Sequence, residues 1–338
     1  MRVGFNPNKD KILSKSDFTH QVIVPVYIPH QNDYFKDCFQ ILRYCLESLI
    51  TTSHAKTYIT VVNNGSCDEV ILYLNQLQLQ GKIHEVIHTT AIGKLNAILK
   101  GLTGHQFPLI TITDADVLFL NNWQKATYEV FEAFPKAGVV STTPSSKMLK
   151  QYTSNVIISN LFSKKLKFTR VLNPKAMLMF AESIGNKDFY KSGHLKKYLT
   201  ISNNNNFKAV IGAGHFLATY KGSVFDSLKE RYTPFALGGT SEDLFLDKPV
   251  NDFGYWRLST IDNYTYHMGN LKENWMQKIF ESITDNSKLE VIKLRFEKKH
   301  SFFGVYYKNI LFKLILIKPF WKLFLQYKGL SKEEIKMY

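Results

Sequence analysis

Two aspartates, Asp114 and Asp116, follow the apolar run PLITIT at residues 108–113. Ligands of open α/β sheets bind at the carboxyl ends of the strands, where these two residues are expected to lie. Neighbouring carboxylates repel one another and lose hydration, a cost that a cation usually offsets. Oxygen ligands favour Mg²⁺ or Mn²⁺, which would in turn bind a diphosphate. The pattern predicts a metal–diphosphate site; the alternative is that both aspartates cap the following turn.

A second acidic pair, Glu242 and Asp243, lies at the predicted start of a helix. A carboxylate in this position could take a proton from a hydroxyl group as its oxygen attacks a reactive carbon. The helix N-terminus would keep that carboxylate ionised. Without further context, an N-terminal capping arrangement with Ser241 is the favoured interpretation of the pair.

Several other residues have both a functional and a structural interpretation. Lys94 could approach a diphosphate as a point charge or could be solvated at a helix start. His267 could complete a metal coordination shell or could be a partly buried structural residue. Gly212 and Gly214 would allow close approach of a ligand, with His215 lining a pocket, or they could mark a bend in a sheet.

The N-terminal half of the chain shows the alternation that would position these motifs. Apolar runs alternate with helix-period stretches from residue 21 to residue 144, which is typical of a buried, mostly parallel sheet. The expected strands are 21–29, 57–65, 82–90, 108–116 and 137–143. Phe39, Leu42, Leu46 and Leu49 recur at helical spacing, and helices are also expected at 68–80 and 94–102.

The alternation lapses at residues 145–207, which end in four asparagines that predict a loop. The segment KAVIGAGHFLATY (208–220) predicts a strand pair. A helix is then expected from Ser241 to Lys248, ended by Pro249. We divide the chain into an N-terminal lead (1–20), two halves of the sheet-bearing part (21–144 and 145–275) and a basic apolar helical tail (276–338).

Lysines interrupt the apolar tail from Val305 to Leu330 at short intervals. A helix that spans a bilayer needs about 20 nearly uncharged residues, so we expect no span here. Pro319 is expected to divide the segment. Two short interfacial helices with snorkelling lysines are one interpretation, and a helix pair packed on the domain is the other.

Composition limits the partners that the protein could bind. The 338 residues carry a formal net charge of +15, which attracts polyanions. The sequence shows no recognisable nucleic-acid module, so an anionic membrane surface and nucleotide phosphates are the expected partners, and nucleic acid is not. Three cysteines without a C-x-x-C pair and a polar N-terminus indicate a reducing, cytoplasmic location, with peripheral attachment to the inner face of the cell membrane as an option.

The order of the motifs resembles glycosyltransferase family 2, a group of GT-A enzymes, over about residues 21–270. The matching segments are VIVPVY, VVNNGS, GKLNAILKGL, TDAD, GAGHFLATYKGSVF, SEDLFL and YHMG. This resemblance implies a three-layer α/β/α sandwich around a mostly parallel sheet. It also implies that residues 21–144 are the nucleotide-sugar-binding half and residues 145–275 the acceptor-binding and catalytic half. It further implies that Asp116 binds Mn²⁺ or Mg²⁺ with His267, that Asp114 faces the ribose and the water shell of the metal, and that Asp243 is the catalytic base while Glu242 orients the acceptor.

By the same resemblance, the donor would be a nucleotide sugar, with a UDP-sugar favoured, and the acceptor a glycan or glycolipid. The implied donor-binding residues are Pro25, Asn63, Asn64, Lys94, Asp114 and Asp116. The family usually has an aspartate where this chain has Asn63 and Asn64. Because an amide both donates and accepts hydrogen bonds, the sequence does not rank uracil, thymine and guanine.

The expected reaction is transfer with inversion at the anomeric carbon, in the synthesis of cell-surface polysaccharide or lipopolysaccharide. Three alternatives are open at this stage. A phosphatase of the haloacid-dehalogenase type also uses D-x-D after an apolar strand, although that motif normally opens its domain. A nucleotidyltransferase would need a glycine-rich loop that VPVYIPHQND lacks. A membrane-bound scaffold without activity would not need both acidic pairs.

Overall fold

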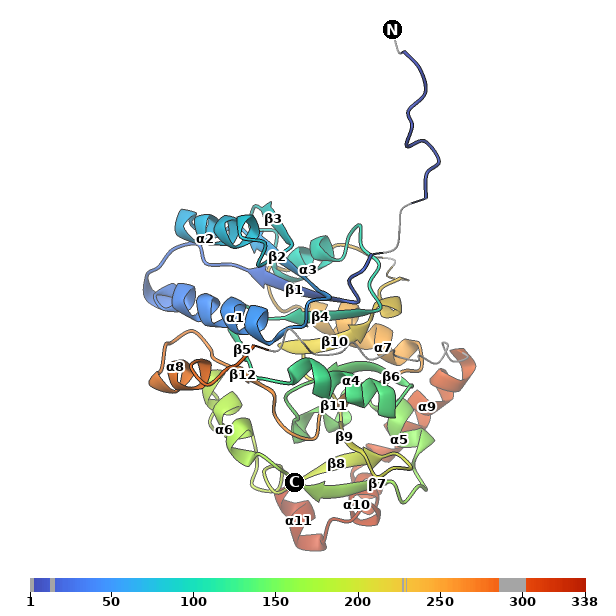
Figure 1. Cartoon of the computed structure of the whole chain (residues 1–338). Helices are drawn as coiled ribbons and strands as arrows, with labels where there is room; N and C mark the ends of the chain where they lie inside the picture. The colour runs from blue at the N-terminus through green and yellow to red at the C-terminus, as the bar shows by residue number, and fades with distance from the viewer. Residues whose placement is uncertain (1–2, 13–15, 227, 229, 286–301) are drawn as a thin grey trace.

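A computed structural model describes residues 3–12, 16–226, 228, 230–285 and 302–338. Its centre is a ten-stranded sheet in the order β3-β2-β1-β4-β10-β6-β11-β9-β8-β7, which is covered by helices (Figure 1). The first seven strands in the chain are β1 His20–Val26, β2 Thr57–Asn64, β3 Glu85–Thr89, β4 Leu109–Thr113, β5 Val117–Phe119, β6 Ala137–Ser141 and β7 Leu166–Arg170. The others are β8 Lys197–Ser202, β9 Lys208–Ile211, β10 Leu217–Lys221, β11 Trp256–Ser259 and β12 Thr265–His267. β5 and β12 form a separate two-stranded sheet.

The N-terminal half has the predicted parallel arrangement. β1 pairs in parallel with β2 and β4, and β2 pairs in parallel with β3. The connecting helices are α1 Cys38–Thr52, α2 Asp68–Leu79 and α3 Lys94–Gly101. Val22 and Val24 pack in the core beneath α1 and α2, whereas Ile23 packs with α3 on the other face. This two-residue period explains why the strand reads as a continuous apolar run: both of its faces are buried.

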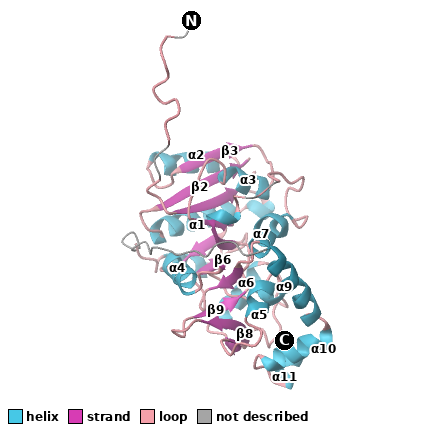
Figure 2. Cartoon of the chain, turned by 90° about the vertical axis from the view of Figure 1, so that its right-hand side faces the viewer, coloured by secondary structure: helices cyan, strands magenta, loops and turns pink. Residues whose placement is uncertain are grey.

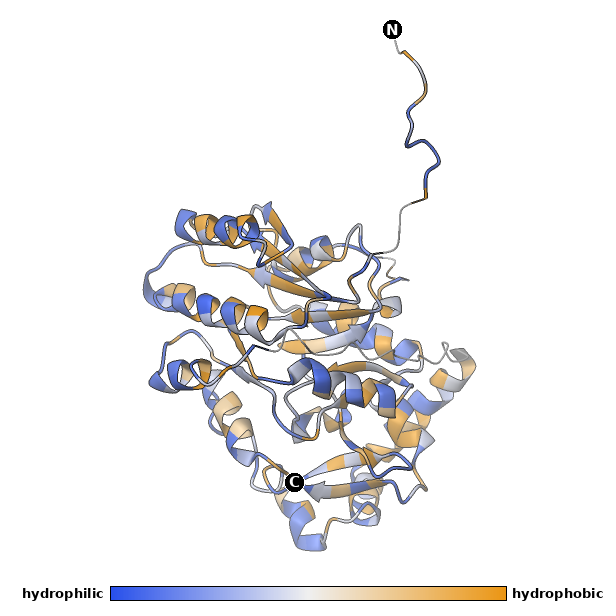
Figure 3. Cartoon of the chain, in the orientation of Figure 1, coloured by the Kyte–Doolittle hydropathy of each residue, from blue (hydrophilic) through white to orange (hydrophobic). Residues whose placement is uncertain are grey.

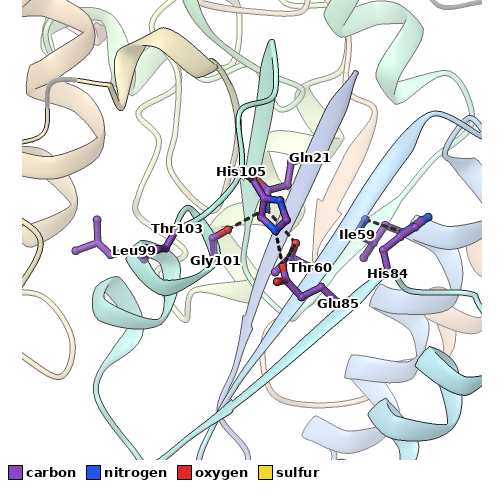
Figure 4. Close-up of polar contacts among 9 residues, drawn as sticks. All are labelled: Gln21, Ile59, Thr60, His84, Glu85, Leu99, Gly101, Thr103 and His105. Carbon is purple, nitrogen blue, oxygen red and sulfur yellow. Dashed lines mark hydrogen bonds and ion pairs between the residues drawn. The ribbon is translucent and has the colours of Figure 1, made fainter. Parts of the chain in front are cut away.

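A polar cluster joins the outer strands of this half (Figure 4). Gln21 Nε2 donates to Thr60 Oγ1 at 3.0 Å and to the carbonyl oxygen of Gly101 at 2.9 Å. Thr60 Oγ1 in turn donates to Glu85 Oε2 at 3.0 Å, and His105 Nε2 lies 3.1 Å from the same oxygen. The donor groups of Gln21 and Thr60 are thus satisfied beside the core, whereas Gln21 Oε1 is buried without a hydrogen-bond partner among the described residues.

The C-terminal half turns the sheet antiparallel. β10 lies antiparallel between β4 and β6, so it joins the two halves into one sheet. The predicted strand pair 208–220 does contain two strands, β9 and β10, but they are not neighbours: β9 pairs with β8 and β11 instead. The asparagine run forms the turn between β8 and β9, as predicted. The fold class is confirmed as α/β with a large central sheet and C-terminal helices.

The other elements of the sheet-bearing part of the chain are helical. They include 3-10 turns at Asp33–Phe35, Ser146–Lys150 and Gly222–Val224. The α-helices are α4 Trp123–Ala133, α5 Ser154–Ser159, α6 Pro174–Ser183, α7 Lys248–Asp252 and α8 Asn274–Phe280, and η4 Asp243–Asp247 is a π-helical turn. Of these elements, the 3-10 turn Ser146–Lys150, α5 and α6 lie in the stretch in which the sequence alternation lapses.

The expectation that Pro249 ends its helix is wrong. The π-helical turn at Asp243–Asp247 runs directly into α7, which ends at Asp252. Pro249 lies in the first turn of α7, where a backbone N–H makes no hydrogen bond within the α-helix, so the missing N–H of proline is tolerated. The change from π to α geometry therefore lets the chain continue through the proline.

The tail forms three helices at the opposite end of the sheet from β3 (Figure 2): α9 Phe302–Ile315, α10 Lys318–Tyr327 and α11 Lys332–Met337. The chain breaks between α9 and α10 immediately before Pro319, as predicted. Among the described residues, no helix is both long and apolar enough to cross a bilayer. Phe312, Phe324 and Leu325 are buried in the core of the C-terminal half. Residues 286–301 of the predicted tail lie outside the described residues.

Candidate active site

The carboxyl end of β4 positions the two aspartates of the TDAD motif. β4 ends at Thr113, and the N–H of Asp114 donates to the carbonyl oxygen of Phe216 at 2.7 Å. β5 then pairs antiparallel with β12, with Val117 opposite His267. The ligand atoms of Asp114, Asp116 and His267 lie within 4.8 Å of one another, and we call these three residues the first acidic cluster.

The hydrogen bonds of His267 determine which of its ring nitrogens faces the aspartates. The hydroxyl of Ser183 donates to the carbonyl oxygen of Phe180 at 2.8 Å, so its oxygen is left to accept from His267 Nδ1–H at 2.9 Å. The neutral ring then carries its lone pair on Nε2, which lies 3.4 Å from Asp116 Oδ2. A histidine oriented in this way is prepared to bind a metal ion.

Asp116 is a carboxylate without sufficient partners. Its Oδ1 atom is buried and has no hydrogen-bond partner among the described residues. Burial is the main cause that raises the pKa of Asp116 to about 6, and the charge of Asp114 adds to it, whereas His267 and Lys94 act in the opposite direction. A divalent cation would satisfy the orphaned oxygen and offset the desolvation cost. The residues present therefore fit a hard metal ion with one nitrogen and two carboxylate ligands.

Lys94 lies between the two acidic motifs. Its Nζ atom is 2.6 Å from Asp114 Oδ1 and 2.7 Å from Glu242 Oε1. Burial by itself would lower the pKa of Lys94, but the two carboxylates raise it above its ordinary value. The sequence predicted Lys94 near a diphosphate; the structure adds that it joins Asp114 to Glu242.

A glycine at the start of α3 makes this arrangement possible. Gly93 has φ +92°, and a Cβ atom there would lie 3.0 Å from the Cα of Ala236 and from the carbonyl oxygen of Phe235. The adjacent N–H of Lys94 donates to the carbonyl oxygen of Ala236 at 2.9 Å. The segment that leads to Glu242 is thereby held against the N-terminus of α3, because only glycine permits the approach.

The second acidic motif lies in a hydrogen-bonded network. Gln151 Nε2 donates to Asp243 Oδ1 at 2.8 Å and to Asp247 Oδ2 at 3.2 Å. The ligand atoms of His215, Asp243 and Asp247 lie within 4.8 Å of one another, and we call these three residues the second acidic cluster. A neutral donor, the amide of Gln151, thus holds the side chain of Asp243 in place.

Arg257 neutralises this second acidic cluster from within. Its Nη1 atom donates to Asp247 Oδ1, both side chains are fully buried, and Nη2 donates to the carbonyl oxygen of Ala213 at 2.7 Å. Burial would raise the pKa of Asp247, but Arg257 and His215 lower it below its ordinary value. His215 Nδ1 lies 3.1 Å from Asp247 Oδ2; burial opposes its protonation, yet this carboxylate raises the pKa of His215.

The predicted nucleotide-binding residues lie at the carboxyl ends of β1 and β2. Pro25 is buried in β1 beyond Ile23, the last residue that pairs with β4, so its missing N–H is tolerated there. The side chain of Asn63 accepts from Ser66 N at 3.0 Å and contacts His88 Nδ1 at 2.9 Å. That of Asn64 accepts from Ile92 N at 2.8 Å. Both amides brace their own loops, and their role toward a nucleobase stays a prediction.

Gly212 is explained by the fold. It has φ +101°, and a Cβ atom there would lie 2.6 Å from the carbonyl oxygen of Met148. Its N–H donates to the carbonyl oxygen of Arg257 at 2.9 Å. These contacts with the protein's own backbone favour the interpretation of Gly212 as a bend in the sheet. A Cβ atom on Gly214 would meet no atom within 4 Å, and His215 lies in the second acidic cluster.

Comparison with known protein families decides the class of the protein. Residues 22–194, just over half of the chain, match the family described as Glycosyl transferase family 2. The chain belongs to this family. The expected family and enzyme class are confirmed, which favours a glycosyltransferase over the phosphatase, nucleotidyltransferase and scaffold alternatives. No curated protein matches the chain by sequence.

Several solved structures are similar to this glycosyltransferase at low identity. The mannosyltransferase PcManGT from Pyrobaculum calidifontis, in complex with GDP-Man and Mn²⁺, is 17% identical with a TM-score of 0.41; the match covers 75% of this chain and 57% of that chain. TarS 1-349 from S. aureus, in complex with UDP-GlcNAc, is 15% identical with a TM-score of 0.45, and the match covers 77% and 61% of the two chains. The chain thus spans about three fifths of the length of these structures.

Four residues of the site were missed by sequence reasoning: Gln151, Asp247, Arg257 and Ser183. Asp247 follows Asp243 by four residues, and that spacing could have indicated a shared helix face. Gln151 and Arg257 carry no local signal, because each is a single polar residue in a segment far from both acidic motifs. Ser183, which orients His267, was missed for the same reason.

Proposed function

We propose that this glycosyltransferase moves a sugar from a nucleoside-diphosphate sugar, with a UDP-sugar favoured, onto a hydroxyl group of a glycan or glycolipid, with inversion at the anomeric carbon. The observation that carries the proposal is the carboxylate of Asp116, whose buried Oδ1 has no hydrogen-bond partner in the described part of the chain and whose Oδ2 lies beside His267 Nε2. A site with this deficit of positive charge suits Mn²⁺ or Mg²⁺, held by Asp114, Asp116 and His267. Such an ion, when bound, supplies positive charge to the departing diphosphate.

The residues of this chain would divide the remaining work. Lys94, already between Asp114 and Glu242, can place a cation near the diphosphate. Asp243 takes the proton of the acceptor hydroxyl as its oxygen forms a bond to the anomeric carbon. The bond from that carbon to the diphosphate oxygen breaks, and the nucleoside diphosphate leaves with the electron pair. Glu242 orients the acceptor. A role in cell-surface polysaccharide or lipopolysaccharide synthesis is proposed by analogy within the family.

Binding of the donor can be tested by thermal unfolding with UDP, GDP or TDP, each with and without Mn²⁺. A ligand that binds only the folded state raises the Tm, so we expect a metal-dependent rise with one of the nucleotides. Asp116→Ala should abolish the rise. Folded protein that shows no rise with any nucleotide would contradict the proposal.

The chemical roles need a separate measurement. We expect Asp243→Asn to reduce kcat by about a hundredfold or more while the metal-dependent Tm shift persists. NMR of the product made from a donor of known configuration reports the anomeric outcome. Retained configuration would contradict a single displacement.

A further inference from the structure

The tail helices are apolar on two sides. On α9, Val305 and Phe312 are buried, and Asn309 Oδ1 accepts hydrogen bonds from Ser154 Oγ and from Asn251 Nδ2 at 3.2 Å. These contacts fix α9 to α5 and α7. Most of the other large apolar side chains described on α9 are exposed, although the helix is already packed on the domain.

The exposed apolar side chains form a regular pattern. On α9 they lie at positions 306, 310 and 314 and at the neighbouring positions 307 and 311, so they form one stripe at 3.6 residues per turn. They continue through Ile317 into α10, where the spacing is i, i+3, i+7. We call this set the exposed apolar face; it comprises Tyr306, Tyr307, Ile310, Leu311, Leu314, Ile317, Phe320, Leu323 and Tyr327. In Figure 2, α9 and α10 lie along one outer edge of the molecule, and Figure 3 shows apolar colour on α9 there.

The charges of the same helices have one sign. Between Phe302 and Leu330 the sequence contains five lysines and no aspartate or glutamate. Lys313, Lys318 and Lys322 are exposed. At 100° per residue, Lys313 lies at one border of the exposed stripe of α9, whereas Lys318 and Lys322 lie on the side of α10 opposite Phe320 and Tyr327. Long lysine side chains in such places can extend to lipid headgroups while their stems cover apolar surface.

We propose that the exposed apolar face docks on an anionic lipid bilayer surface, with Tyr, Leu and Ile side chains in the headgroup–acyl boundary and the lysines against the headgroup phosphates. Contiguous exposed apolar residues with basic neighbours are the pattern of interfacial helices. A second copy of the chain fits less well, because a twofold interface would bring lysines against lysines with no acidic partner on these helices. Single-stranded nucleic acid fits less well because, although four side chains of the face are aromatic, the other five are aliphatic and offer no ring on which bases could stack.

Vesicle sedimentation of the full chain tests the docking without any sugar transfer. We expect the protein to co-sediment with vesicles of phosphatidylglycerol and phosphatidylcholine in equal parts, and far less with pure phosphatidylcholine or at high salt. Leu314→Ser with Leu323→Ser, at positions 50% and 64% exposed, should weaken partitioning about tenfold or more. The matched control is Leu72→Ser with Leu79→Ser on α2, at positions 69% and 89% exposed, which should bind vesicles as the wild type does.

The outcomes separate this proposal from its rivals. Equal loss in both double variants, or no binding by the wild type, would overturn it. Light scattering that shows a dimer, lost only in the Leu314/Leu323 variant, would also overturn it in favour of a second copy of the chain. An oligonucleotide that displaces the protein from vesicles in proportion to its own binding would overturn it in favour of nucleic acid. The metal-dependent Tm shift with nucleotide should persist in both double variants. That control keeps the failure of docking distinct from the failure of donor binding.

Discussion

The two acidic clusters of this glycosyltransferase solve the same electrostatic problem in different ways. In the second acidic cluster, the buried carboxylate of Asp247 is matched inside the protein by the guanidinium of Arg257 and by His215. In the first acidic cluster, Asp116 Oδ1 is buried without a hydrogen-bond partner among the described residues, and Lys94 serves Asp114 rather than Asp116. The comparison indicates that the second cluster holds its counter-charge within the protein, whereas the first needs a cation from solution.

The largest expected effect comes from Asp116→Asn. Removal of the charge should reduce sugar transfer by about a hundredfold to a thousandfold, because positive charge at the leaving diphosphate would no longer be held in place. Without metal, the same variant should be at least as stable as the wild type, since a desolvated carboxylate beside Asp114 is removed. Activity with Mn²⁺ and urea unfolding without it measure the two effects. If Asp116→Asn lost as much stability as Asp247→Asn in the second acidic cluster, the two clusters would not differ as described.

In the second acidic cluster, Asp247→Asn should act chiefly on stability. It leaves Arg257 buried without its counter-charge, which typically costs about 3–5 kcal/mol of unfolding free energy. Urea unfolding measures this loss. The double change Asp247→Leu with Arg257→Met should recover much of it, because neither charge is then buried alone. A double variant as unstable as the single one would show that the pair is not the source of the effect.

Lys94→Met tests the link between the two acidic motifs. Loss of the cation should weaken binding of a nucleoside diphosphate by about tenfold, as expected for a charged hydrogen bond. Binding of Mn²⁺ alone should become slightly tighter, because Asp114 is no longer neutralised. Calorimetric titration measures both, and Lys100→Met, on the exposed side of the same helix, is the control. Equal weakening of metal and nucleotide would instead indicate local unfolding.

Gln151→Leu should reduce kcat by about tenfold with little change in the donor KM, because a residue that orients another group typically has an effect of this size. Gln151 donates to Asp243 and contributes no charge of its own. Steady-state kinetics with varied donor concentration separates the two constants, and Gln80→Leu at the exposed end of α2 is the control. A rise in donor KM alone would place Gln151 in donor binding rather than in the positioning of Asp243.

The smallest expected effect is on the pH dependence of stability. The pKa of Asp247 is lower in the folded protein than in the unfolded chain, so its ionised form stabilises the fold fully above the unfolded pKa of about 4. That contribution is lost as the pH falls through the folded pKa. Unfolding free energies of the wild type should therefore fall more steeply with acidification below about pH 4 than those of Asp247→Asn. Parallel curves would contradict this assignment.

Features with local or periodic signals could be predicted from the sequence. The spacing of Leu42, Leu46 and Leu49 predicted α1, and the uninterrupted apolar runs predicted strands buried on both faces. The TDAD motif was identified because its aspartates directly follow such a run. Pro249 misled the prediction, since the rule that proline ends a helix does not anticipate a π-helical turn before it.

Local and periodic sequence patterns did not predict the contacts between segments that are distant in the chain. β9 and β10 follow one another in the chain yet lie apart in the sheet, because β10 fits between β4 and β6. His267 was placed near the metal only through the family resemblance, and the tautomer that turns Nε2 toward Asp116 depends on Ser183 from α6.

The sequence by itself determined the residue types of both acidic motifs, the alternation of strands and helices, and the basic, apolar character of the tail. These features can be identified from neighbouring residues, because they depend on the spacing of apolar residues and on the position of the acidic residues directly after an apolar run or at a helix start. Only the tertiary structure decided which carboxylates receive a counter-charge from the protein and which do not. Arg257 and Gln151 reach their partners from other parts of the fold, and the electrostatic state of a buried carboxylate depends on the groups around it in space rather than on its neighbours in the chain.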